Sequence, residues 1–138
     1  MRLSFYILAI LRWTWCLPQS LLGACVLLYV HLKRPRDWDW ESSLGLWVVH
    51  NPLNFSVSLG QFIFLRRVWS SYLSQRLWKH EYGHALQSYY LGPLYLILVG
   101  IPSATLNLLA RRFMWFDINY YNLYPEQWAD KLGGVKRL

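Results

Sequence analysis

The sequence predicts a mainly α-helical membrane protein with one β-hairpin, folded as a single membrane domain over residues 1–138. Charged residues make up only 15% of the chain, whereas soluble domains carry about 25%. Aromatic residues reach 18%, and the chain has nine Trp, a residue enriched at membrane surfaces. Two apolar stretches, 3–32 and 91–110, hold at least the roughly 20 residues that a membrane-spanning helix needs.

The basic residues are grouped beside the apolar stretches rather than spread along the chain. The net charge is +7, and the clusters are Lys33-Arg34-Pro35-Arg36, Arg66-Arg67, Arg76 with Lys79, Arg111-Arg112 and Lys136-Arg137. Short clusters of this kind contact anionic lipid headgroups at the ends of membrane segments. We therefore expect membrane lipid as a partner, and no nucleic acid.

The first element is a transmembrane helix over 3–32, in which Arg12 is the only formal charge. Pro18 predicts a kink, because a proline inside a helix removes a backbone hydrogen bond. Two Trp close to Arg12 leave a second interpretation open, in which they mark the membrane surface and only 17–32 enters the lipid.

A β-hairpin is predicted over 44–64. Two apolar runs, 44–50 and 55–64, flank the turn Asn51-Pro52-Leu53-Asn54, and the second run alternates between apolar and small polar residues. An unpaired strand edge is not stable in lipid, so the hairpin must lie at the membrane surface or be covered by helices. It serves either as an edge to which an extended peptide is added or as a purely structural ribbon. The polar stretch 33–43 before it is expected to be an interfacial loop.

The next helix, over 74–91, carries the pattern H-E-x-x-H in His80-Glu81-Tyr82-Gly83-His84. On a helix this spacing puts both imidazoles on one face, one turn apart, with Glu81 beside them. Two imidazoles so placed can bind one tetrahedral Zn²⁺ and leave room for a third ligand and a water. Glu81 would then take the proton of that water. The alternative is an exposed helix face that carries two His without function.

Other residues of this helix, within the pattern and close to it, have expected roles as well. Gln87 and Ser88 share the face of His84, where they either hydrogen-bond a bound ligand or satisfy neighbouring backbone groups. Gly83 allows another element to approach closely, as a packing notch between helices does. A serine among Ser70, Ser71 and Ser74 is expected to cap the helix, and Gly92-Pro93 to end it.

The last third of the chain predicts a second membrane-inserted helix over 93–111, bent at Gly100-Ile101-Pro102, and then an aromatic loop over 113–124. A short helix over 125–132 follows, with Pro125 at its first position and glycines at its end. Glu126 and Asp130 are four residues apart and share one face of this helix. Glu126 is the only Glu after the motif, which makes it the candidate third ligand.

An H-E-x-x-H pattern followed by E-x-x-x-D resembles the gluzincins, the thermolysin-like zinc metallopeptidases. The residues that carry this likeness are His80, Glu81, His84, Glu126 and Asp130. The resemblance implies that His80, His84 and Glu126 bind zinc and that Glu81 is the general base. It also implies that Asp130 orients an imidazole, a role that fits the habit of metal-bound His of donating its second N–H to a carboxylate.

The chain departs from the gluzincins because it has no room for their soluble lobes and no recognisable counterpart of their substrate-binding residues. Membrane burial is closer to the site-2 proteases, but their Asp-Gly motif is absent in its usual form. Residues 80–134 are also similar to small uncharacterised bacterial membrane proteins that share the HEYGH sequence.

The function expected from these features is that of a membrane-embedded zinc metallopeptidase acting on a membrane protein or peptide, in the bacterial cytoplasmic membrane. The candidates for stabilising the oxyanion are Tyr82, Tyr89, Tyr120 and Tyr121. The main alternative is a non-catalytic subunit of a larger membrane complex, in which a fourth ligand such as His50 or Asp117 closes a structural site. A lipid-processing hydrolase with the same chemistry is a third interpretation.

Overall fold

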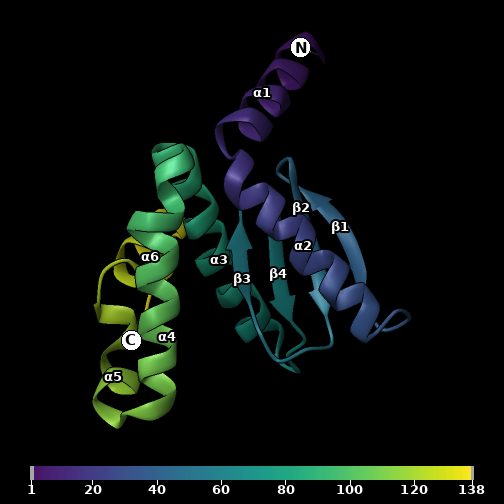
Figure 1. The fold of residues 1–138 in the computed structure, drawn as a ribbon. Coiled ribbons are helices and arrows are strands. Elements are labelled where there is room, and N and C mark those ends of the chain that lie inside the picture. The colour runs from purple at the N-terminus through teal and green to yellow at the C-terminus, as the bar shows by residue number, and fades with distance from the viewer. Residues whose placement is uncertain (1, 138) are drawn as a thin grey trace.

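The computed structural model describes residues 2–137 and is mainly helical, at 65% helix, with a small mixed sheet. The helices are α1 (Arg2–Trp15), α2 (Leu17–Lys33), α3 (Ser71–Leu91), α4 (Ile101–Arg112), α5 (Met114–Asn119) and α6 (Glu126–Gly133). The strands are β1 (Asp39–Ser43), β2 (Leu46–Asn51), β3 (Val57–Leu59) and β4 (Phe62–Arg66). In Figure 1, α3 lies between the sheet and the C-terminal helices α4 to α6.

The predicted N-terminal helix over 3–32 is broken into two. The chain bends by 89° between Ala9–Trp15 and Leu17–Lys33, with the break at Cys16. A bend was expected at Pro18, but this proline lies in the first turn of α2, where its missing N–H is not needed. Among residues 2–137 no helix is by itself both long and apolar enough to cross a membrane, whereas the bent pair passes that test by length and composition.

The sheet has four strands in the order β1-β2-β4-β3, so the single hairpin predicted over 44–64 is wrong in its pairing. The two apolar strands β2 and β4 run parallel at its centre, with Val48 opposite Ile63. Each pairs with a polar or short outer strand through a tight turn of two residues, at Leu44-Gly45 and at Gly60-Gln61. Positive φ angles at Leu44, Gly45 and Gly60 give these turns the twist that short hairpins need. The stretch 33–43, expected to be a loop, therefore supplies β1.

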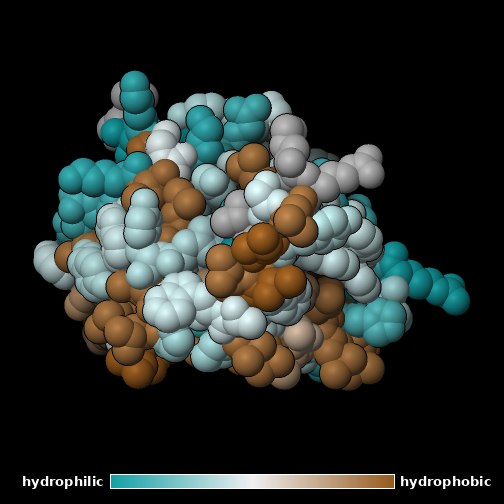
Figure 2. All heavy atoms as spheres, turned by 90° about the horizontal axis from the view of Figure 1, so that it is seen from above, coloured by the Kyte–Doolittle hydropathy of each residue, from teal (hydrophilic) through white to brown (hydrophobic). Residues whose placement is uncertain are grey.

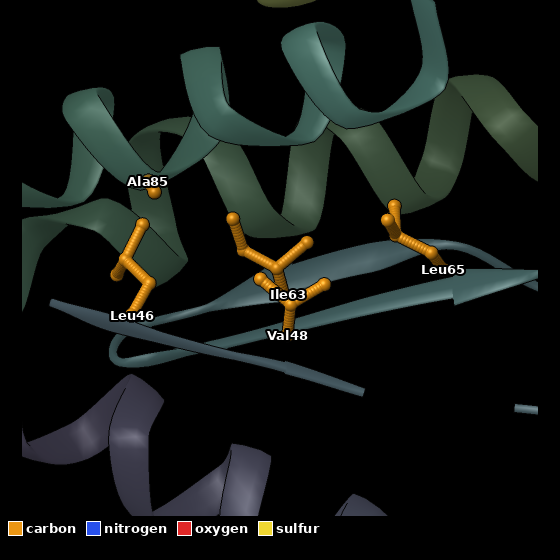
Figure 3. Close-up of a cluster of buried hydrophobic side chains, with 5 residues drawn as sticks. All are labelled: Leu46, Val48, Ile63, Leu65 and Ala85. Atoms are coloured by element: carbon orange, nitrogen blue, oxygen red, sulfur yellow. The ribbon is translucent and has the colours of Figure 1, made fainter. Parts of the chain in front are cut away.

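Both faces of the sheet are covered by helices. Leu46, Val48, Ile63 and Leu65 pack with Ala85 of α3, which Figure 3 shows directed toward the strands. On the opposite face, Val49, Leu59, Phe62 and Phe64 pack with Val26 and Leu27 of α2. This alternation follows from the two-residue period of a strand, and it explains why residues 46–49 of β2 and 62–65 of β4 are apolar on both faces. The sheet thus fixes which side of α3 faces the core.

Helix α3 begins and ends close to the predicted bounds. The Ser70 hydroxyl accepts a hydrogen bond from the Leu73 amide at 3.4 Å, and the helix ends before Gly92, whose φ is +54°. The helix predicted over 93–111, with a bend at Gly100-Ile101-Pro102, is instead a 3₁₀ turn (Gly92–Leu94), a π-helical turn (Leu96–Gly100) and α4, which begins at Ile101. The stretch 113–124, predicted to be a loop, contains α5 and the 3₁₀ turn Tyr120–Asn122.

Large apolar side chains remain exposed on α1 and on the α4–α5 hairpin. They include Leu3, Tyr6, Ile7, Ile10 and Leu11 on α1, Leu108 on α4, and Met114, Trp115 and Ile118 on α5. Figure 2 shows hydrophobic side chains in the centre and lower half of the view from above, with hydrophilic ones along the upper, left and right margins. Exposed apolar patches of this size are typical of surfaces that contact lipid or another protein.

Candidate metal centre

The three ligands predicted from the sequence come together in the structure. His80 and His84 lie on α3, Glu126 is the first residue of α6, and one ligand atom from each lies within 4.8 Å of the others. His80 and His84 are 5% exposed and Glu126 is fully buried. This buried group could hold a metal ion.

Close packing of α6 on α3 brings the carboxylate to the imidazoles. A Cβ on Gly83 would overlap the carbonyl of Ala129, and a Cβ on Gly133 would overlap the carbonyl of Lys79. The backbones therefore touch at both points, as the notch expected at Gly83 allows. Glu126 Oε2 lies 3.0 Å from His80 Nε2 and 3.2 Å from His84 Nε2.

The second nitrogen of each imidazole is held by a different partner. Asp130 Oδ1 lies 2.7 Å from His80 Nδ1, in the position that the resemblance implies for it. Gln87 Oε1 lies 2.7 Å from His84 Nδ1, and Gln87 Nε2 donates to the carbonyl of Pro125 at 3.1 Å. Because that carbonyl can only accept, the Gln87 amide is oriented with its oxygen toward His84. In the neutral rings both Nδ1 atoms then carry the hydrogen, and both Nε2 lone pairs point to Glu126.

Three acceptor atoms that converge in a buried site need a positive charge between them. Burial acts against protonation of His80, but hydrogen bonds with Asp130 and Glu126 outweigh it and raise the pKa of His80 to about 9. Burial also acts against ionisation of Glu126, yet hydrogen bonds with His80 and His84 hold its pKa well below the usual range. The site therefore attracts a cation, either a metal ion or a proton.

Glu81 lies beside the ligands without bonding one of them. It is 5% exposed, and its Oε2 is buried with no hydrogen-bond partner in the part of the chain that the structure describes. Burial raises the pKa of Glu81, and the neighbouring His84 and His80 act in the opposite direction. An unpartnered carboxylate oxygen in this position can accept a hydrogen bond from a water in the site.

Two supporting residues were not predicted from the sequence. The hydroxyl of Ser103 on α4 donates to Glu126 Oε1. Arg137 Nη2 donates to Asp130 Oδ1 at 3.1 Å, and its guanidinium lies 3.2 Å from the centre of the Tyr121 ring. The sequence assigned Arg137 to a lipid-facing basic cluster, but in the structure it pairs with Asp130. Neither role could be inferred before the positions of α4 and the C-terminus were known.

The four tyrosines proposed for the oxyanion separate into two pairs. Tyr82 and Tyr89 pack against the core on the sheet side of α3, away from the imidazoles. Tyr121 presents its ring to His80, with 5.3 Å between ring centres, and burial raises the pKa of both Tyr120 and Tyr121. These two hydroxyls therefore stay protonated and able to donate.

Neither candidate for a fourth ligand belongs to the group. His50 Nε2 lies 3.2 Å from Glu41 Oε1 on the neighbouring strand, and Asp117 is exposed on α5. Within residues 2–137, the group that could hold a metal ion consists of His80, His84 and Glu126. Comparison of the chain with models of protein families, with curated protein sequences and with solved structures found no match.

Proposed function

We propose that the protein is a membrane-embedded zinc metallopeptidase, in which His80, His84 and Glu126 hold the zinc. The observation that carries this proposal is the convergence of three buried acceptor atoms, with the outer nitrogen of each imidazole already bonded. Two imidazoles and one carboxylate are a donor set of catalytic zinc sites, in which the fourth position is left for water. The lack of a fourth ligand within the described residues fits this set better than a closed structural site.

Zinc bound in such a site supplies an activated water and polarises a carbonyl oxygen. Glu81 is the residue suited to take the proton of that water and return it to the leaving amine, because its Oε2 has no other partner within residues 2–137. Tyr120 and Tyr121 are the residues suited to donate a hydrogen bond to the developing oxyanion.

Peptide hydrolysis is favoured by the order of the site residues along the chain. An H-E-x-x-H helix followed by E-x-x-x-D resembles the arrangement of the gluzincins, and the Glu126 and Asp130 positions have the contacts that this resemblance implies. Location in a membrane is supported by the exposed apolar side chains of α1, α4 and α5 and by the apolar α1–α2 pair. We propose a membrane protein or peptide as the substrate.

The test is metal content and hydrolysis in the same detergent-purified preparations. Wild type should bind one zinc, His84→Ala should bind little, and His50→Gln, a control whose ring pairs with Glu41 away from the site, should match wild type. Glu81→Gln should keep its zinc and lose hydrolysis of a quenched-fluorescent peptide library. Equal zinc in wild type and His84→Ala, or unchanged hydrolysis in Glu81→Gln, would refute the proposal.

A further inference from the structure

A small cavity lies next to His80 and is lined by three arginines. Its volume is about 120 Å³, and Arg66, Arg76 and Arg137 line it together with His80, Tyr121 and the apolar side chains of Val68, Leu73 and Leu77. Pockets for drug-sized ligands have about 300–1,000 Å³. This cavity therefore has room for one small group next to the candidate metal centre.

Two of the three guanidinium groups have no anionic partner among the described residues. Arg137 is compensated by Asp130. Arg66 donates only to the neutral amide oxygen of Asn54, at 3.4 Å, and Arg76 lies over the ring of Tyr72 with its Nε buried and without a partner. No Asp or Glu of residues 2–137 lines the cavity. Three guanidinium groups around one small cavity, with an unsatisfied buried donor, favour the binding of an anion.

The position of Arg76 defines how far that anion lies from the reacting bond. Arg76 precedes His80 by four residues on α3, so the two side chains share one face and lie about one helical turn, roughly 5.4 Å, apart. An extended peptide covers about 3.3–3.6 Å per residue. A group bound at Arg76 would thus belong to the first or second residue from the peptide bond at the metal centre.

We propose that this cavity binds a carboxylate of the substrate peptide, one or two residues from the bond that is cleaved. The carboxylate is either the C-terminus of the peptide or an Asp or Glu side chain, and both make the same paired hydrogen bonds with planar guanidinium groups. The small volume favours a single carboxylate over a phospholipid headgroup with its glycerol. The assignment to a substrate rests on the proposed peptidase function.

The experiment measures binding in zinc-loaded full-length Glu81→Gln, which should bind peptides without cleaving them. The probes are short acetylated peptides in two kinds of matched pair. The first pair compares a peptide with a free C-terminal carboxylate and the same peptide with a C-terminal amide. The second compares Asp with Asn at each of the two positions nearest the C-terminus. At least one acid should bind about tenfold more tightly than its neutral partner, the effect expected of a charged hydrogen bond. Adding Arg76→Gln or Arg66→Gln should remove this difference, and Arg76→Lys should retain part of it.

Arg67→Gln is the matched control, because Arg67 is adjacent to Arg66, carries the same charge, and pairs with Asp39 at 3.6 Å outside the cavity. The control should keep the preference for the acid. Equal binding of acids and neutral partners, or the same loss in Arg67→Gln as in Arg76→Gln, would overturn the proposal. Arg76-dependent binding of dihexanoyl phosphatidylglycerol in place of the peptide acids would also overturn it. An intact preference for acids in a protein that hydrolyses no peptide would support the carboxylate site and refute the peptidase.

Discussion

Gln87→Leu should weaken zinc binding although Gln87 is not a ligand. The side chain bonds His84 Nδ1 at 2.7 Å and the Pro125 carbonyl at 3.1 Å, and it is fully buried. Leucine removes both bonds and leaves the imidazole free to carry its hydrogen on Nε2, the atom that faces Glu126 and would bind the metal. Loss of an outer partner of a metal-bound His costs about 10–100-fold in affinity, or about 1.4–2.8 kcal/mol.

The same substitution should also destabilise the metal-free protein. The Pro125 carbonyl loses its donor in a buried position, which costs about 1–3 kcal/mol. Gln87→Glu separates the two effects, because its carboxylate still accepts from His84 but places an acceptor against the Pro125 carbonyl. We expect Gln87→Glu to lose stability and to bind zinc more tightly than Gln87→Leu does.

The assay is competition for zinc with a chromophoric chelator, combined with thermal unfolding after metal removal. Ser88→Ala is the matched control, because Ser88 is also fully buried on α3 and its hydroxyl has no hydrogen-bond partner within residues 2–137. Its zinc affinity should equal that of wild type. Folded Gln87→Leu with the affinity of wild type would show that Gln87 does not orient His84 for the metal.

Three further predictions concern the packing and the charge of the site. Gly83→Ala should reduce the zinc content and lower the melting temperature, because the new Cβ forces α6 away from α3. Gly100→Ala is the control: a Cβ there meets no atom closer than 3.4 Å, so zinc content and melting temperature should not change. Ser103→Ala should lower zinc affinity by about tenfold in the chelator competition, because Glu126 loses the donor to its second oxygen. In the metal-free protein the pKa of His80 is raised from 6.5 to about 9, so its protonation stabilises the fold fully below pH 6.5, and this stability is lost as the pH rises to about 9. Zinc affinity should rise over the same pH range, because the metal displaces that proton. The measurements are the melting temperature of the metal-free protein and the zinc affinity between pH 6 and 10. If neither changes with pH, the prediction is wrong.

Features that depend on neighbouring residues could be predicted from the sequence. The end of α3 follows from Gly92, and its start lies three residues before the predicted position 74, because Ser70 is the serine that caps it. The positions of His80 and His84 follow from the helical period. The parallel pairing of β2 with β4 could not be predicted, because apolar strands buried on both faces show a continuous apolar run that fits several partners. The alternation in 55–64 indicated strands and gave no information about their order.

The site shows the same division between local and distant information. Glu126 and Asp130 were identifiable because acidic residues are scarce in this chain and the two share a helix face. Gln87 was placed on the correct face, but its partner could be named only after α6 had brought Pro125 to it. Ser103 and Arg137 come from segments whose path depends on the turns after Gly92 and Gly133. Their contacts are consequences of tertiary structure with no local pattern in the sequence.

The two faces of α3 connect the fold to the proposed chemistry. Ala85, Tyr82 and Tyr89 hold one face against the sheet, and His80 and His84 lie on the other, so the rigid core fixes the direction of both imidazoles. The carboxylate comes from α6, which is joined to α3 through turns and short helices and touches it where glycines allow. Because the converging acceptors repel one another unless a cation lies between them, metal binding and the docking of α6 stabilise each other. The sheet side of α3 supplies a fixed half of the site, and an ion bound between His80, His84 and Glu126 would hold α6 against it.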